Sequence, residues 1–329
     1  MGLEIEVLSW SELVAVCGSP GKAKRQLRDG VYRRVIRNTY VLADVEDTPQ
    51  TRLAALKKVV PADSVLSHWT ALFALGLDVL PRDAKGPDLL DLTAPRERRL
   101  ATRKGVRTHI ALVEDEDLCE LDGLLLVSPA RAFVDVARSY GLVEGVACGD
   151  AALRAGLTTI DLVEEAVDRA GGLRWVSLAR AAVGHLDERS ESLMESRLRV
   201  GFVVAGGPRM RAQVDLYDEQ GGHRGRCDLF LAGVCVEYDG KASRLEEVPF
   251  TGDRERGNGI AGLEVEVRRF TGTMYYRSTP AQRLRVLTEA LRIAAGRPRP
   301  RLRFGPDTLR APKWRPPLTR ADRQARRTA

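Results

Sequence analysis

The chain has 329 residues, of which 44% are hydrophobic and 29% are charged, and its formal net charge is +7. This length is enough for two or three domains, each with its own core. The chain has no apolar run of about 18 residues, which argues against a membrane span, and its N-terminus lacks the features of a secretory signal.

The first 48 residues are predicted to form a winged helix-turn-helix. Ser9 and Glu12 have the spacing of a capping box before a short helix, WSELVAVC. Ser19 is suited to cap a second helix, PGKAKRQLRD, which ends at Gly30. The next segment, VYRRVIRNTYVLA, alternates like the two strands of a hairpin. Two helices followed by a hairpin is the order of a winged helix.

Basic side chains gather on the second helix and the hairpin of this module. Asp29 is the one acidic residue among them, and they lie on the elements that would meet a groove and the backbone of DNA. A solvated basic face is the alternative interpretation. The predicted DNA-binding residues are Lys22, Lys24, Arg25, Arg28, Arg33, Arg34 and Arg37.

Residues 49–187 are predicted to form an α/β middle domain. The segment TRLAALKKVVPADSVLSHWTALFALGL is typical of two helices interrupted at Pro61. DLLDLTA and GVRTHIALV are typical of strands, while SPARAFVDVARSYG and VEGVACGDAALRAG have apolar residues at helical spacing. A histidine such as His68, beside Trp69 in an apolar helix, is more often packed than catalytic. Because neither His68 nor His109 shows a nucleophile–base spacing, we predict no chemistry for this domain.

Residues 188–296 are predicted to form a second α/β domain, which begins where HLDERSES interrupts the apolar pattern. A helix is followed by a three-stranded meander, a loop-rich stretch, a further strand and a final helix. The predicted helices cover residues 192–204 and 279–295, and the predicted strands cover residues 212–217, 224–231, 234–240 and 264–271.

Two acidic residues in the meander suggest a metal site. If Ala232 and Gly233 form a two-residue turn, Asp228 lies directly opposite Glu237 on the neighbouring strand. Two carboxylates so close repel each other, and burial in a sheet increases the cost. A divalent cation would offset that cost, and hard oxygen ligands select Mg²⁺ or Mn²⁺ over zinc. The alternative is a slipped register that separates the two carboxylates.

Three further side chains complete the predicted catalytic site. Glu195 shares a helical stripe with Leu198 and should point toward the core, although it could instead close a capping box with Ser192. Asp239 and Lys241 alternate onto the face of Glu237. Lys241 could orient the attacking water, whereas Asp239 could form an ion pair with Arg226 across the strands. The predicted catalytic residues are Asp228, Glu237, Asp239, Lys241 and Glu195, with Asp228, Glu237 and Glu195 as metal ligands.

The last segment, residues 297–329, accounts for the positive charge of the chain. It holds 11 Arg or Lys and two Asp, a net charge of +9, which leaves about −2 for the remainder. Rich in Pro and Arg, it is predicted to be a disordered basic tail. Such a tail attracts phosphate-rich partners or simply aids solubility.

The five cysteines are few and irregularly placed. Their number is odd and none has the C-x-x-C spacing of a zinc or redox motif. We therefore expect reduced thiols in a cytoplasmic protein, and no structural zinc site.

The segments ESLMESRLR, GRCDLFLAGVCVEYDGK and VRRFTG resemble a restriction-endonuclease-like domain related to very-short-patch-repair nucleases, in the PD-(D/E)xK superfamily. The resemblance covers about residues 190–295 and implies a mixed sheet flanked by helices. It also implies that Asp228 and Glu237 bind the metal and that Glu195 is the acid on the helix. Asp239 stands where the superfamily usually has its lysine, so Lys241 would have to replace that lysine.

The front half, over about residues 8–185, is similar to AbiEi-type antitoxins and transcriptional regulators of bacteria. WSELVAVCGSPGKAKRQLRDGVYRRVIRNTYVL, LSHWTALFALGL and SPARAFVDVAR carry this similarity. It implies DNA binding and a nucleotidyltransferase toxin as a partner. In this chain RNTY replaces the glycine-containing turn expected in the wing.

Two functions follow as hypotheses. The first is a DNA-binding, Mg²⁺-dependent endonuclease that serves in defence or mobile-element biology. The second is an AbiEi-type antitoxin or transcriptional autoregulator in which the nuclease fold is inactive.

Overall fold

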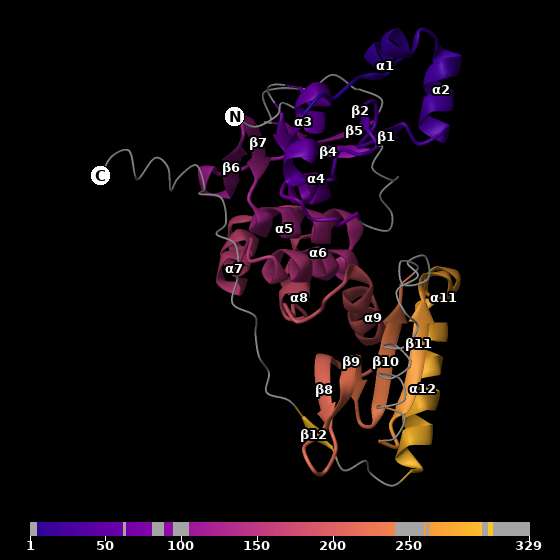
Figure 1. Cartoon of the computed structure of the whole chain (residues 1–329). Coiled ribbons are helices and arrows are strands. Elements are labelled where there is room, and N and C mark those ends of the chain that lie inside the picture. Colours follow the sequence, from indigo (N-terminus) through magenta and orange to yellow (C-terminus); the bar gives the residue numbers. More distant parts are fainter. Residues whose placement is uncertain are drawn as a thin grey trace. The chain divides into compact units, whose positions relative to one another are not determined.

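The computed structural model describes residues 5–61, 64–80, 89–94, 105–240, 260, 263–297 and 302–304. The described residues form two compact units with a mixed α/β composition (Figure 1). The N-terminal unit takes residues 5–148 and 157–181, and the C-terminal unit takes residues 149–156 and 182–304. Among the described helices, none is long and apolar enough to cross a membrane.

The N-terminal unit begins with the two helices and the hairpin that the sequence predicts. Ser9 caps the first helix through a complete capping box with Glu12, and Ser19 caps the second helix by accepting from the amide of Lys22. Asn38, with a φ of 60°, lies in the left-handed region at the turn of the hairpin. The elements are α1 (Trp10–Cys17), α2 (Pro20–Arg28), β1 (Tyr32–Arg34) and β2 (Tyr40–Leu42).

A five-stranded sheet with the order β5-β4-β3-β7-β6 follows in the same unit. The pairs β4–β5 and β3–β7 are parallel, and the other two pairs are antiparallel. The strands are β3 (Val65–Leu66), β4 (Leu90–Ala94), β5 (Val106–Ile110), β6 (Leu118–Leu121) and β7 (Leu124–Val127), with a short 3-10 helix, η1 (Asp115–Asp117), before β6. The helices are α3 (Pro49–Val59), α4 (His68–Ala74), α5 (Pro129–Tyr140), α6 (Leu142–Arg154), α7 (Ile160–Arg169) and α8 (Val176–Val183), of which α6 ends in the C-terminal unit.

The helix predicted directly after Pro61 is shorter than expected. Val65 and Leu66 form the central strand β3, paired with β4 on one side and β7 on the other, and the helix starts only at His68. Four apolar or small residues before a helix fit a buried strand as well as a helical turn, so periodicity alone does not separate the two.

Buried ion pairs connect α5 to its neighbours in the N-terminal unit. Arg131 lies between Asp117, at 3.1 Å, and Asp135, at 3.2 Å, and all three side chains are almost fully buried. Arg169 of α7 binds Asp117 from the other side at 2.8 Å. Since each buried charge has an opposite partner, the network orients α5, α7 and the start of β6.

The C-terminal unit is a five-stranded mixed sheet with the order β11-β10-β9-β8-β12. Only the β10–β11 pair is parallel. Figure 1 shows α12 running along β11. The elements are α9 (Leu193–Val204), β8 (Arg211–Tyr217), β9 (His223–Leu231), β10 (Val234–Asp239), β11 (Glu266–Thr271), α11 (Gly272–Arg277), α12 (Pro280–Ala295) and β12 (Arg303–Phe304).

Two hydrophobic cores involve this sheet. The helix-side core joins residues of α9, α11 and α12 to strand residues such as Leu229 and Val236. The opposite core contains Val214, Leu216, Cys227, Phe230, Cys235, Ile260, Leu263 and Val265. In β10, Val234 and Val236 face the helix-side core and Cys235 faces the opposite core, as strand alternation requires.

Two expectations are corrected in this unit. Residues 303–304, which lie in the predicted disordered tail, form β12 and pair with Tyr217 and Leu216 of β8. Cys227 and Cys235, expected to be reduced, form a disulfide between β9 and β10. This bond could not be predicted from cysteine spacing, because the two cysteines are eight residues apart and meet through the hairpin.

Candidate functional site

The predicted register of β9 and β10 is confirmed as far as their ladder extends. Leu231 pairs with Val234 around the Ala232–Gly233 turn, and the pairing continues to Leu229 and Val236. The next pair in this register would be Asp228 and Glu237. At that point the amide of Tyr238 donates to Oδ2 of Asp228 at 2.8 Å, so a side-chain oxygen serves as its acceptor.

Strand β8 changes face close to Asp228. Ala212 packs in the helix-side core, whereas Val214, two residues later, packs in the opposite core. Alternate residues of a regular strand share one face, so the backbone must twist between them. Gln213 provides that twist with a φ of 52°, in the left-handed region that non-glycine residues rarely adopt.

Gln213 bridges two of the predicted metal ligands. Its Nε2 donates to Oε2 of Glu195 at 2.7 Å and approaches Oδ1 of Asp228 at 3.4 Å. Glu195 is 6% exposed and lies in the first turn of α9, and the amide of Glu191 also donates to its Oε2 at 2.8 Å. Ser192 does cap this helix by accepting from the amide of Glu195, but the carboxylate of Glu195 points to Gln213. The structure therefore brings Glu195, Gln213 and Asp228 together.

The negative charges of this group are not fully compensated. Burial, together with the nearby carboxylates of Glu195 and Glu237, raises the pKa of Asp228 to about 6. The hydrogen bonds from Tyr238 and Gln213 lower this pKa but do not outweigh those effects. A cation bound among these oxygens would offset the repulsion between the carboxylates.

Glu237 is near Asp228 but has a partner of its own. Nε of Arg269, in register on β11, binds its carboxylate at 2.9 Å. The neighbours of Glu237 along the strand, Val236 and Tyr238, belong to the helix-side core, so Glu237 points to the opposite face of the sheet. The full predicted set of three carboxylates is therefore less tightly grouped than the sequence suggests.

The other predicted catalytic residues are only partly placed. Asp239 ends β10, in register with Thr271. Arg226, the predicted partner of Asp239, lies 3.5 Å from Glu191 and 3.9 Å from Asp215. Lys241 lies outside the described residues.

The donor set around Asp228 fits a hard divalent cation. Carboxylates of Asp228 and Glu195 offer oxygen ligands of the kind that Mg²⁺ and Mn²⁺ prefer. The elevated pKa of Asp228 shows that its ionised form is disfavoured at this site, and a nearby positive charge would stabilise that form. The residues present are thus compatible with the predicted ion.

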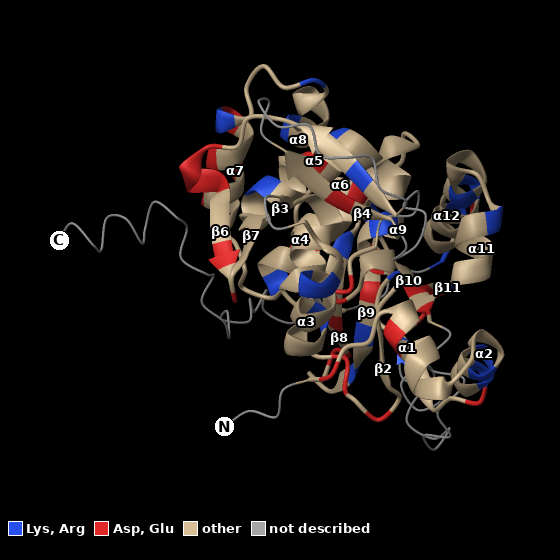
Figure 2. Cartoon of the chain, turned by 90° about the horizontal axis from the view of Figure 1, so that it is seen from above, with Lys and Arg blue, Asp and Glu red and all other residues tan. Residues whose placement is uncertain are grey.

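The predicted DNA-binding side chains lie on α2 and the hairpin β1–β2. In Figure 2 the basic residues of α2 gather on that short helix. Arg25 and Arg28 are strongly exposed, although both lie within 3.5 Å of Asp29. Arg33 differs, because its guanidinium donates to the carbonyl of Val45 and joins the hairpin to the following segment. The residues that are at least partly exposed are Lys22, Lys24, Arg25, Arg28, Arg33, Arg34 and Arg37.

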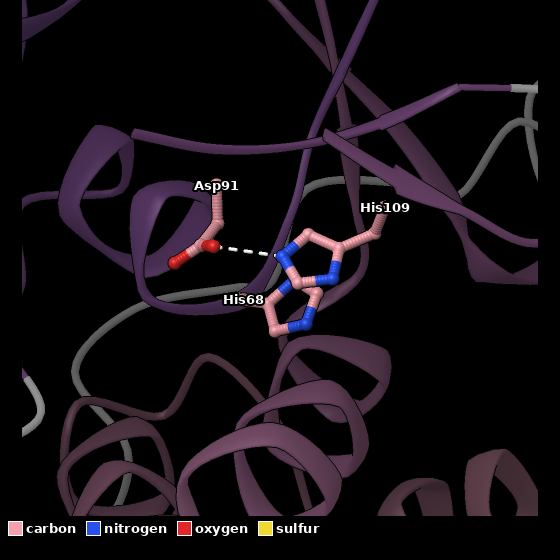
Figure 3. A group of neighbouring side chains, drawn as sticks. All are labelled: His68, Asp91 and His109. Atoms are coloured by element: carbon pink, nitrogen blue, oxygen red, sulfur yellow. Dashed lines mark hydrogen bonds and ion pairs between the residues drawn. The ribbon is translucent and has the colours of Figure 1, made fainter. Parts of the chain in front are cut away.

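A second polar group, missed in the sequence, lies in the N-terminal unit. His68, Asp91 and His109 come from α4, β4 and β5, and their ligand atoms lie within 4.8 Å of one another (Figure 3). Nε2 of His109 lies 2.7 Å from Oδ1 of Asp91, and the hydroxyl of Tyr140 donates to Oδ2. Nη1 of Arg107 donates to that hydroxyl at 2.9 Å. Asp91 is thus a buried acid surrounded by donors.

The geometry of the two histidines does not suit one shared metal ion. Their rings are stacked, with centroids 3.8 Å apart and planes 28° apart. A metal lies in the plane of each imidazole that binds it, so stacked rings direct their lone pairs along separate paths. Each ring nitrogen of His68 also faces a serine hydroxyl, Ser67 at 2.9 Å and Ser139 at 3.0 Å. We interpret the group as a hydrogen-bonded network that stabilises buried Asp91.

The electrostatics of this network agree with that interpretation. Burial opposes ionisation of Asp91, but its other contacts, including the hydrogen bonds from His109 and Tyr140, outweigh this effect and lower its pKa. Burial, and then His109, holds the pKa of His68 well below its usual range, so His68 is neutral. An ionised acid beside a neutral histidine is a stable arrangement at neutral pH.

Neither Gln213 nor this network could be found from the sequence. The five-residue turn between β8 and β9 does not fix their register, so nothing placed Gln213 opposite Asp228. His68 and Asp91 meet through the β3–β4 pairing, and β3 was predicted as helix. The one available signal was the pair of histidines itself.

No protein-family model matches the chain. Similar proteins occur in Mycobacterium tuberculosis: Uncharacterized protein MT2308 of strain CDC 1551 / Oshkosh and Uncharacterized protein Rv2248 of strain ATCC 25618 / H37Rv. Each is 29% identical to the chain over 204 residues, which are 62% of this chain and 71% of the relative. Neither name states an activity, so the function proposed below is argued from the geometry of the chain's own residues.

Proposed function

We propose that the chain is a DNA-binding, metal-dependent endonuclease of the PD-(D/E)xK type, with its active site around Asp228. The observation that carries the proposal is the half-buried carboxylate of Asp228, which lies near Glu195 and Gln213 and whose pKa of about 6 reflects partial burial and two further acids, Glu195 and Glu237. Such crowding of carboxylates costs free energy unless a cation occupies the site. Perturbed acids of this kind are concentrated at functional sites.

In this proposal the carboxylates of Asp228 and Glu195 would hold Mg²⁺ or Mn²⁺, while Glu237, on the other face of the sheet, remains paired with Arg269. The bound ion supplies Lewis-acid polarisation of a phosphodiester and a water of lowered pKa. Gln213 positions the two carboxylates, because its amide contacts both of them. The amide of Tyr238 fixes the direction of Asp228.

The N-terminal elements supply DNA binding in the same proposal. We infer a winged helix in residues 1–48, since α1, α2 and the β1–β2 hairpin follow one another and α2 is strongly basic. The alternative function, an AbiEi-type antitoxin or transcriptional autoregulator with a nucleotidyltransferase toxin as partner, is favoured by the Arg269–Glu237 ion pair. That pair occupies a carboxylate that an active nuclease would need for its metal.

Cleavage of plasmid DNA in Mg²⁺ or Mn²⁺ tests the proposal. We expect Asp228→Asn to abolish cleavage while DNA binding persists, because the substitution removes a metal ligand but leaves the basic helix intact. Asp215→Asn is the matched control, since Asp215 lies on β8 of the same unit and faces His223 and Arg226. DNA binding by the wild type without cleavage in either metal would reject the nuclease and favour the regulator.

A further inference from the structure

A cavity of about 290 Å³ in the C-terminal unit is rich in arginine. It lies among residues 184–189, the middle of α9 and the start of β8. One carboxylate, that of Asp187, belongs to the lining, against four guanidinium groups. The arginines of this arginine pocket are Arg189, Arg199, Arg209 and Arg211.

Arg199 is the buried member of the arginine pocket. It is 7% exposed, and its Nη1 donates to the carbonyl of His185 at 2.7 Å, while its Nη2 donates to Asp150 at 2.6 Å. Its Nε is buried and has no hydrogen-bond partner among the described residues. A buried donor without an acceptor costs free energy, so an acceptor brought by a ligand would be stabilised there.

The lining has a positive electrostatic potential. Arg209 donates to the carbonyl of Gly184 and lies 3.0 Å from Nδ1 of His185. Burial lowers the pKa of His185, and the charges of Arg209 and Arg199 lower it further. Asp187 lies 2.8 Å from Arg189 and Asp150 lies 2.6 Å from Arg199, so four guanidinium groups meet two carboxylates at the pocket. The cavity therefore favours an anion.

We propose that the arginine pocket binds a phosphate group of a nucleic-acid strand. Guanidinium groups present paired donors that match phosphate oxygens, and the cavity is at the lower end of the size of small-ligand sites. This inference deepens the proposed function and rests on it for the identity of the strand.

The position of the pocket relates it to the carboxylates around Asp228. On α9, Arg199 follows Glu195 by one helical turn, and side chains so spaced are neighbours, about 5–6 Å apart at Cβ. On β8, Arg211 precedes Gln213 by two residues, about 7 Å along the strand. Two elements thus carry both features, and a strand held at the pocket passes close to Asp228.

Inorganic phosphate is the first probe of this site. Thermal unfolding of the full chain is measured in phosphate and in chloride at equal ionic strength. We expect phosphate to stabilise the wild type, and the double variant Arg209→Gln/Arg211→Gln to lose at least about tenfold in phosphate affinity. Both residues are exposed, so the variant should fold. Arg285→Gln, an exposed site on α12, is the control for a lost charge. Equal stabilisation of all three proteins would overturn the pocket.

A short single-stranded oligonucleotide is the second probe. It is titrated in a background of Lys24→Ala and Arg28→Ala, so that the N-terminal helix does not dominate binding. We expect Arg209→Gln/Arg211→Gln to weaken oligonucleotide binding and the exposed Arg285→Gln to leave it unchanged. If phosphate affinity falls but oligonucleotide affinity does not, the pocket binds a free phosphate compound and the nucleic-acid inference is wrong. Pocket-dependent binding without any cleavage would instead overturn the proposed hydrolysis and leave the pocket standing.

Discussion

At the scale of single residues, the fold holds Asp228 where its charged form is unfavourable. Its carboxylate accepts from the amide of Tyr238, yet burial and two neighbouring acids raise its pKa to about 6. The protonated form is therefore favoured by folding. Protonated Asp228 therefore contributes to the free energy of unfolding. This contribution is complete at a pH below about 4 and is lost as the pH rises through 6.

Asp228→Asn should consequently stabilise the metal-free protein at pH 8. The elevation of about two pKa units corresponds to about 2–3 kcal/mol of unfolding free energy, and the difference should vanish near pH 4. Urea unfolding of both proteins across this range, in a chelator, measures it. Added Mn²⁺ should stabilise the wild type and reduce the difference in unfolding free energy between the two proteins at pH 8. A variant that is less stable than the wild type at pH 8 without metal would contradict this account.

At the scale of elements, α5 is held by charge as well as by hydrophobic packing. Arg131 is 2% exposed and stands between Asp117 and Asp135. Arg131→Met should destabilise the chain by about 3–5 kcal/mol, because it leaves two buried carboxylates with fewer partners. Denaturant unfolding checks this value, with the exposed Arg180→Met on α8 as the control. A loss below about 1 kcal/mol would mean that Arg169, which binds Asp117, and Arg138, which lies 3.1 Å from Asp135, stabilise the two carboxylates without Arg131.

The elements that the sequence predicted well are those with local signals. Capping residues marked the starts of α1 and α2, and the Ala232–Gly233 turn fixed the β9–β10 register. Strands β6 and β7 escaped prediction because LCEL and LLLV are short and lack clear alternation. β12 escaped because its two residues become a strand only through pairing with β8. Long-range pairing is what single-sequence patterns do not contain.

The same division applies to the site. Asp228 and Glu195 could be predicted, one from a hairpin turn and the other from a helical stripe. Gln213 could not, because its contact with both depends on a left-handed backbone residue in β8. The pairing of Glu237 with Arg269 also depends on the parallel β10–β11 register, which a loop-rich connection left open.

At the scale of the whole molecule, two features would contact nucleic acid: the basic helix α2 and the proposed phosphate site of the C-terminal unit. Their contributions to the salt dependence of DNA binding can be separated. Lys24→Ala/Arg28→Ala should lower the slope of log affinity against log salt by about 2, since each phosphate contact contributes about 0.9. Filter binding or anisotropy over a salt series measures the slope. Arg285→Ala/Arg292→Ala removes two exposed charges from α12 and is the control. An unchanged slope in the first variant would exclude α2 as a DNA contact.

The short strand β12 has a practical meaning for work with this protein. Residues 303–304 pair with β8 and end the sheet on that side, and the ring of Phe304 lies 5.5 Å from that of Phe230. Trimming the Pro/Arg-rich segment back to the end of α12 would leave the amides and carbonyls of β8 open to strands of other copies, which invites aggregation. Shortened versions for crystallisation should therefore retain the chain through Phe304.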